Sequence, residues 1–441
     1  MKGLYGMISS HSTGKIKEPT QNNLPFYLFM FIVLVEYLGL GQHYTIINDI
    51  HLPWLLSAVL IVYIIMKYNH AEFIKFTQFR IFLIFLVWTF VAMFFALIKY
   101  NVYVMLTVQI AYFLIFIIAY YMFLDMGSIK KFLYVIFIVH AILILDNLDV
   151  LLSPTRTGHL RAGYFLGDGN DFAWSLVSFL PFSIFMIKEV KSNVSRVFII
   201  ALGITIVFGI VATGSRGAAL ALLSSFAFLA FQGKGRFIRL TLLIISAILI
   251  LSFAPNQYAD RISTIKNYES DSSAVHRIIA WKAAVQMAID YPLGVGQGNF
   301  PSVYGRFYAK DYGSELWRAQ NRWIAPHSIY FLVLAEYGFI GLGMLLYLII
   351  SNMLTNRRTR DLSSRAHEKE KETIYNFSNA CSSSMVAFSV GGIFLGGLNY
   401  PTLYFLTAMT LATNAMVKKE LVPHKKISVV DHRNSVAVAT S

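Results

Sequence analysis

The sequence has few charged residues and a single cysteine. Of its 441 residues, 14% are charged and 56% are hydrophobic, whereas about a quarter of the residues are charged in an ordinary soluble domain. This balance excludes a water-soluble fold. The one cysteine, Cys381, excludes an intrachain disulfide and a cysteine-rich metal site.

Metal-binding patterns are also lacking. The 11 histidines are scattered, with no His-x-x-x-His pair, and no Asp-x-Asp lies in a predicted outer loop. Structural and catalytic metal sites draw on such closely spaced ligands. We therefore expect a site without metal or cofactor.

Apolar runs of about 17 to 22 residues alternate with short charged clusters, and about 20 residues are needed to cross a bilayer. The runs predict an all-α, polytopic membrane protein with about twelve transmembrane helices. The first run has no small-residue cleavage site after it, so we expect it to be retained. The predicted spans cover residues 25–40, 52–66, 81–98, 102–123, 132–152, 172–187, 197–213, 218–231, 237–253, 328–350, 377–398 and 403–417.

The basic residues indicate the orientation of these spans. The net charge is +14, and roughly two thirds of the Lys and Arg residues fall on one predicted side of the membrane, which is the cytoplasmic side by the positive-inside rule. Topology thus explains the positive charge, and we predict no nucleic-acid partner. The predicted organisation is a cytoplasmic segment 1–24, spans 25–253, a periplasmic loop 254–326, spans 327–417 with a cytoplasmic hairpin 354–373, and a cytoplasmic tail 418–441.

The loop 254–326 is the one large extramembrane segment of this organisation. Ser272 or Ser273 is a suitable cap for a helix that ends before Pro292, with Ile278, Trp281, Val285 and Ala288 as its apolar stripe. We expect this amphipathic helix to lie near the membrane surface. Gly294, Gly296 and Gly298 then alternate, without the strand and the Lys-Ser/Thr of a phosphate-binding loop, and predict a flexible turn.

Two arginines lie where a guanidinium is costly without a partner or ligand. Arg216 is in a tight turn between two apolar runs, where it either binds a ligand or extends to the interface. Arg277 lies in the first turn of the loop helix, where its charge adds to the positive end of the helix dipole. A salt bridge to Asp271 or Glu269 is its alternative role.

Polar residues flank two further spans on the same side. His327 follows Pro326 at the start of a span, where a histidine either exchanges protons near neutral pH or is merely amphipathic. Arg161, Asp168, Asn170 and Asp171 precede another span, as a polar cluster or as a capped helix start.

Two glutamates, Glu36 and Glu336, lie inside predicted spans. An ionisable group within the membrane suggests proton coupling in a transporter. For Glu336, a role in helix packing is the preferred interpretation.

Residues from about 161 to 341 resemble the bacterial O-antigen ligase and polymerase superfamily of membrane glycosyltransferases. The most specific match is His327-Ser328 followed by Gly338 and Gly341, as in the ligase motif of His, ten residues and Gly. Arg277 with Trp281 four positions on is similar to the loop Arg motif of the family, although ligases often have Leu where this chain has Trp. Segments 291–300, 161–171 and 214–217 resemble other family elements.

The resemblance implies a GT-C-like helical fold and an enzyme of the bacterial inner membrane. It would move a glycan from undecaprenyl diphosphate to a sugar hydroxyl at the periplasmic face, without nucleotide sugar or metal. The acceptor would be lipid A core in a ligase or a growing polysaccharide in a polymerase. Membrane lipids and a chain-length regulator or other assembly proteins would be further partners.

The resemblance also implies roles for residues. Arg216 and Arg277 would bind the diphosphate and stabilise the leaving group, and His327 would accept or orient the acceptor's proton. Arg161, Asp168, Asn170 and Trp281 are weaker candidates for substrate binding. The alternatives that stay open are ligase or polymerase, a protein O-oligosaccharyltransferase, and a transporter or flippase without catalysis.

Overall fold

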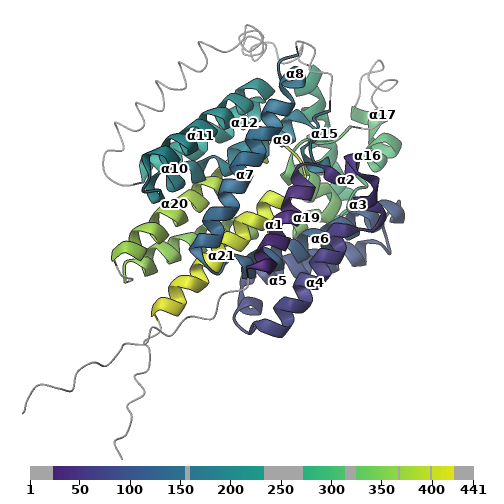
Figure 1. Ribbon diagram of the computed structural model, residues 1–441. Helices are drawn as coiled ribbons and strands as arrows, with labels where there is room; N and C mark the ends of the chain where they lie inside the picture. Colours follow the sequence, from purple (N-terminus) through teal and green to yellow (C-terminus); the bar gives the residue numbers. More distant parts are fainter. Residues whose placement is uncertain are drawn as a thin grey trace, which may run out of the picture.

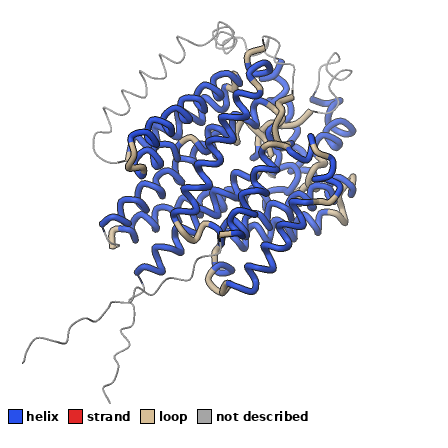
Figure 2. Tube along the Cα trace, viewed as in Figure 1, coloured by secondary structure: helices blue, strands red, loops and turns tan. Residues whose placement is uncertain are grey.

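The computed structural model describes residues 23–153, 159–232, 272–312, 324–365, 368–397 and 400–421, and within them every regular element is a helix (Figure 2). The first half contains α1 Leu24–Tyr37, α2 Leu40–His43, α3 Thr45–Asp49, α4 Leu52–Lys67, η1 Phe73–Lys75, α5 Thr77–Ala92, α6 Lys99–Met122, α7 Met126–Asp146, α8 Leu148–Leu151, η2 Tyr164–Leu166, α9 Gly169–Phe179, α10 Pro181–Glu189, α11 Asn193–Thr213 and α12 Arg216–Phe231. The second half contains α15 Ser272–Asp290, α16 Phe300–Val303, η4 Tyr304–Tyr308, α17 Ala309–Tyr312, α19 Ile329–Ser363, α20 Glu368–Gly391 and α21 Pro401–Leu421.

The last three long helices form the centre of the bundle. Helix α20 packs against α9, α10, α12 and α19, and α21 packs against α6, α19 and α20. Every residue from Pro401 to Asn414 is buried, although this part of α21 contains several threonines. A helix that is surrounded by protein can carry such polar residues, because its side chains and backbone bond within the bundle.

Five helical segments are long and apolar enough to cross a membrane: Lys99–Met122, Met126–Asp146, Gly169–Glu189, Asn193–Thr213 and Ile329–Ser363. Four shorter helices, α1, α4, α5 and α12, are also apolar. The predicted span 237–253 lies outside the described residues, and each of the other predicted spans overlaps a described helix. The all-helical prediction is confirmed for the described part, and about twelve crossings stay a prediction.

Several boundaries differ from the predicted ones. Pro181 interrupts the span Gly169–Glu189 and divides it into α9 and α10, because proline lacks the N–H that an unbroken helix uses. Helix α19 continues to Ser363 and α20 begins at Glu368. Most of the predicted hairpin 354–373 is therefore helical rather than loop.

The predicted glycine turn after α15 is confirmed as a turn, and its backbone is bonded to α19. The amide of Val295 donates to the carbonyl of Ala335 at 3.0 Å, and that of Gly296 donates to the carbonyl of Glu336 at 3.0 Å. The Glu336 carboxylate in turn accepts the backbone N–H of Phe300 at 3.1 Å. Glu336 therefore joins the turn to α19, which agrees with the packing role that we preferred for it.

Helix α19 is kinked where this turn meets it. Gly338 has φ 70° and ψ −170° inside an otherwise helical segment, a conformation that L side chains rarely adopt. A methyl group at Gly338 would overlap the carbonyl oxygen of Pro292. The kink and the close approach of the two backbones therefore both require glycine.

We expect Gly338→Ala to lower the thermal denaturation midpoint of the purified protein in detergent, since this backbone conformation, which is almost confined to glycine, costs other residues about 1–3 kcal/mol. The matched control is Gly343→Ala on the same helix, where a methyl group meets nothing within 4 Å. The control should leave the midpoint unchanged or raise it. Equal midpoints for the two variants would contradict this account of the kink.

Candidate functional site

His327 lies in a strained backbone conformation just before α19. Its φ is 42°, in the left-handed region that is uncommon for residues other than glycine. The next residues are fixed to the connection between α20 and α21. The amide of Ile329 points at two carbonyls, those of Gly392 at 2.9 Å and Leu395 at 3.0 Å. This bonding holds His327 in place.

Residues 392–397, here called the 392–397 loop, contact two parts of the site. A methyl group on Gly396 would come within 3.4 Å of the His327 Cα, and one on Gly217 would come within 2.7 Å of the Phe394 Cβ. The loop thus lies against both the His327 segment and the start of α12, which begins with Arg216. The sequence analysis included these residues in the predicted span 377–398. In the structure, α20 ends at Gly391 and the loop follows it. The pairs Gly391-Gly392 and Gly396-Gly397 were the signal available in the sequence.

Arg216 is the first residue of α12 and is partly buried. The tight turn before it is confirmed: Gly214 has φ 61°, and the Ser215 hydroxyl accepts the N–H of Ala218 at 3.4 Å. The guanidinium therefore starts from a helix N-terminus, where the dipole adds positive potential.

Arg277 and Asp168 lie close enough to His327 to act on its charge, and His327 in turn acts on His276. The side chain remains open to solvent, yet the protein around it lowers the pKa of His327 by partial desolvation, and the positive Arg277 lowers it further. The Asp168 carboxylate acts in the opposite direction. The pKa of His276 is also lowered, mainly by desolvation and to a smaller extent by the charge of His327. Desolvation and Arg277 thus favour the neutral imidazole of His327, the form that is able to accept a proton.

Trp281 connects α15 to the start of α19. Its indole N–H donates to the carbonyl oxygen of Pro326 at 2.8 Å. Its ring stacks on Phe331 with centroids 4.9 Å apart and planes at 13°. Trp281 therefore braces the residue before His327, while Arg277 lies one helical turn earlier on α15.

The buried face of α15 differs from the predicted stripe. Ala280, Ala283, Ala284 and Met287 are fully buried, whereas Ile278 and Val285 are exposed. The face that packs on the protein is the one with the small alanines, which let α15 approach α19 closely at Ala335. The exposed apolar residues stay consistent with a helix at the membrane surface.

The cluster before α9 is divided between two structural roles. Arg161 forms an ion pair with Asp149 (2.6 Å) and one with Asp146 (3.3 Å), and its hydrogen bonds lower the pKa of Asp149. Asp168 is the N-cap of α9 and accepts the N–H of Asn170 at 2.8 Å, so the capped helix start is confirmed. The structure thus brings Asp168 to His327, while carboxylates occupy the guanidinium of Arg161.

No group of three or more His, Cys, Asp or Glu residues suited to a metal ion occurs in the described part of the chain. His327 instead lies within the electrostatic reach of Arg277 and Asp168, and Arg216 begins the helix that the 392–397 loop touches. Guanidinium groups suit phosphate oxygens, and a neutral imidazole suits proton transfer.

These features define a class of protein: a helical bundle with several apolar, membrane-length helices and a polar site of arginine and histidine at one end. Residues 175–346 match the model of the O-antigen ligase family, and this region of the chain belongs to that family. Arg216, Arg277, Trp281 and His327 fall within it. No curated protein matches the sequence significantly. The matched region is that of an O-antigen ligase or polymerase type of membrane glycosyltransferase.

We expect Asp168→Asn to move the acid limb of the pH–activity profile to lower pH. On our expectation that neutral His327 accepts the proton of the acceptor, activity is lost as the pH falls through the lowered pKa of this histidine. Asn caps a helix as well as Asp does, but it removes the charge that raises the pKa of His327. The measurement is kcat/KM between about pH 5 and 8.

Asp149→Asn is the matched control, because it removes a carboxylate that is paired with Arg161. Its acid limb should coincide with that of the wild type. A shift of the Asp168→Asn limb to higher pH would refute the assignment.

Proposed function

We propose that this protein transfers a glycan from undecaprenyl diphosphate to an acceptor sugar hydroxyl at the periplasmic face of the bacterial inner membrane. The observation that carries the proposal is that Arg277 acts electrostatically on His327 across two elements of the family region. A phosphate-binding cation beside a proton acceptor is what such a transfer requires.

Arg216 and Arg277 bind the diphosphate of the donor. Arg216 extends from the N-terminus of α12, and Arg277 lies in the second turn of α15, which begins at Ser272. The helix N-terminus adds positive potential to the Arg216 guanidinium, whereas Arg277, predicted in the first turn of its helix, lies one turn further in. As the bond between the anomeric carbon and phosphate breaks, negative charge grows on the leaving diphosphate, and the arginines stabilise it.

His327 acts on the acceptor. The acceptor oxygen attacks the anomeric carbon, its proton passes to the neutral imidazole or is oriented by it, and the diphosphate leaves with the bonding electrons. Asp168 helps to hold the positive charge that His327 then carries. No metal takes part in this scheme, because the arginines supply the positive charge.

The orientation of the chain completes the proposal. The start of α1 and the end of α21 lie towards the lower end of Figure 1, while α8 and α15 lie at the upper end. We propose that the lower end is cytoplasmic and that the upper end faces the periplasm, with segments 254–326 and 354–373 on opposite sides.

The acceptor is lipid A core for a ligase or a growing polysaccharide for a polymerase, and a protein acceptor is a third form of the same chemistry. A transporter is disfavoured, because the Glu336 carboxylate accepts the Phe300 amide and so has a structural role in joining the turn to α19. A chain-length regulator is a further proposed partner of the polymerase form.

Purified protein with undecaprenyl-diphosphate glycan and each acceptor should form product in the presence of EDTA. Arg216→Ala, Arg277→Ala and His327→Ala should each lower kcat by about 10²- to 10³-fold, as for other groups that stabilise transition-state charge. Product on lipid A core identifies a ligase, and elongated lipid-linked glycan identifies a polymerase.

Arg306→Ala is the control for a general loss of positive charge, since Arg306 is exposed. It should retain wild-type activity. Full activity in all three site variants at normal expression would show that these residues do not form the active site. Complete inhibition by EDTA would refute the metal-free scheme.

Cysteine labelling tests the orientation. In a background with Cys381 replaced, Ala325→Cys should react in intact cells with a thiol reagent that cannot cross the membrane. Ser364→Cys should react only after the cells are opened, because positive-inside topology puts the α19–α20 turn in the cytoplasm. Both positions are exposed, so the reverse pattern would overturn the topology.

A further inference from the structure

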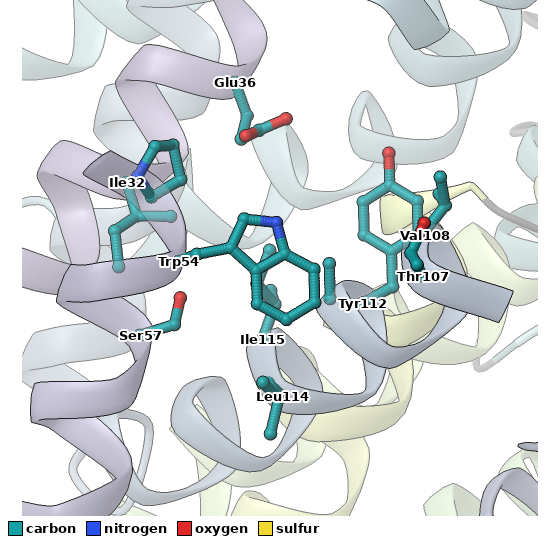
Figure 3. A pocket seen from close by; sticks show the side chains of 11 residues that line it. Ile32, Glu36, Trp54, Ser57, Thr107, Val108, Tyr112, Leu114 and Ile115 are labelled. Carbon is teal, nitrogen blue, oxygen red and sulfur yellow. The ribbon is translucent and has the colours of Figure 1, made fainter. Parts of the chain in front are cut away.

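A cavity of about 290 Å³ lies between α1, α4 and α6. In Figure 3 the indole ring of Trp54 occupies the middle of the view, with the Glu36 carboxylate on one side and Leu114 on the other. Arg216, Arg277 and His327 do not line it. The cavity is therefore separate from the proposed transferase site.

The lining changes from polar to apolar along the helices. Glu36 is the second-last residue of α1, and Trp54 is in the first turn of α4. On α6, Thr107 lies nearer the helix start than Leu114 and Ile115, which are about 12 Å deeper at a rise of about 1.5 Å per residue. This order matches an amphiphile with its head at the interface and a chain reaching into the bilayer.

The polar end of the cavity opens at the same end of the bundle as the candidate site. The carbonyl of Tyr37, at the end of α1, accepts the amide of Gly163 at 2.8 Å, in the segment that leads to Asp168. At the start of α6, the Asn101 side chain donates to the carbonyl of Gly298 at 3.1 Å. Any lipid head held here belongs to the leaflet that the transferase site faces.

The Glu36 carboxylate determines what kind of head fits. It is half-buried, and within the described residues no group donates a hydrogen bond to it. A carboxylate without partners is costly in a membrane protein. A ligand that brings N–H donors and a positive charge removes this cost, and the indole face of Trp54 adds a favourable site for a cation.

We propose that this cavity binds a phospholipid through a primary-amine head group of the ethanolamine type. The ammonium group bonds to Glu36 beside Trp54, and one acyl chain lies along Ile32, Leu114 and Ile115. A diphosphate carrier is disfavoured here, because its charge has the same sign as that of Glu36. The lipid site goes beyond the transferase proposal and does not depend on it.

Native mass spectrometry of the purified full chain tests this site. The protein is offered equal amounts of four lipids with the same acyl chains and with ethanolamine, trimethylated choline, glycerol or neutral glucosyl heads. The wild type should retain the ethanolamine lipid at least about tenfold over each of the others, and Glu36→Gln should reduce this preference to under about twofold.

Two further variants make the result decisive. Ala111→Phe fills the cavity without changing its charge and should also abolish retention of the ethanolamine lipid, which keeps the test valid if Glu36→Gln folds poorly. Glu72→Gln makes the same charge change at an exposed residue outside the cavity and should behave as the wild type. Equal retention of all lipids, preference for any other head, or unchanged selectivity in both Glu36→Gln and Ala111→Phe would overturn the proposal.

Discussion

The contact between the glycine turn and the kink of α19 positions most of the candidate site. At Glu336, α19 supplies one backbone carbonyl to Gly296 and one carboxylate oxygen to Phe300, and at Gly338 its backbone turns so that the carbonyl of Pro292 can approach. Because the turn directly follows α15, this contact fixes α15 on α19. Arg277 lies on α15 and His327 lies just before α19. The contact between the turn and α19 therefore sets the position of these two residues relative to each other.

The contacts of the 392–397 loop also hold the site together. The 392–397 loop bonds to the backbone at Ile329 and touches the start of α12 at Gly217. The segments of Arg216 and His327 are far apart in the sequence. The 392–397 loop contacts both of them. In the proposed reaction this arrangement holds the phosphate-binding groups and the proton acceptor rigidly, and preorganised charge stabilises a transition state without further reorganisation.

Hydropathy predicted the helical spans well, because the length of an apolar run follows from the thickness of a bilayer. The tight turn before Arg216 and the helix start at Asp168 also followed from local residue chemistry. The glycines predicted the turn but not its bonds to α19, since alternating glycines allow flexibility and close packing equally. The face of α15 that packs on α19 was not predicted for a related reason: periodicity finds an apolar face, but the facing helix selects the small residues Ala283 and Ala284.

The sequence by itself determined that the chain is helical and built for a membrane, and it indicated Arg216, Arg277 and His327 as candidates, because apolar length and costly charges are local properties. Only the tertiary structure decided which partners these residues meet. It paired Arg161 with Asp149, brought Asp168 to His327, and formed the Glu36 cavity from three helices. These outcomes depend on contacts between distant segments, and no local pattern specifies such contacts.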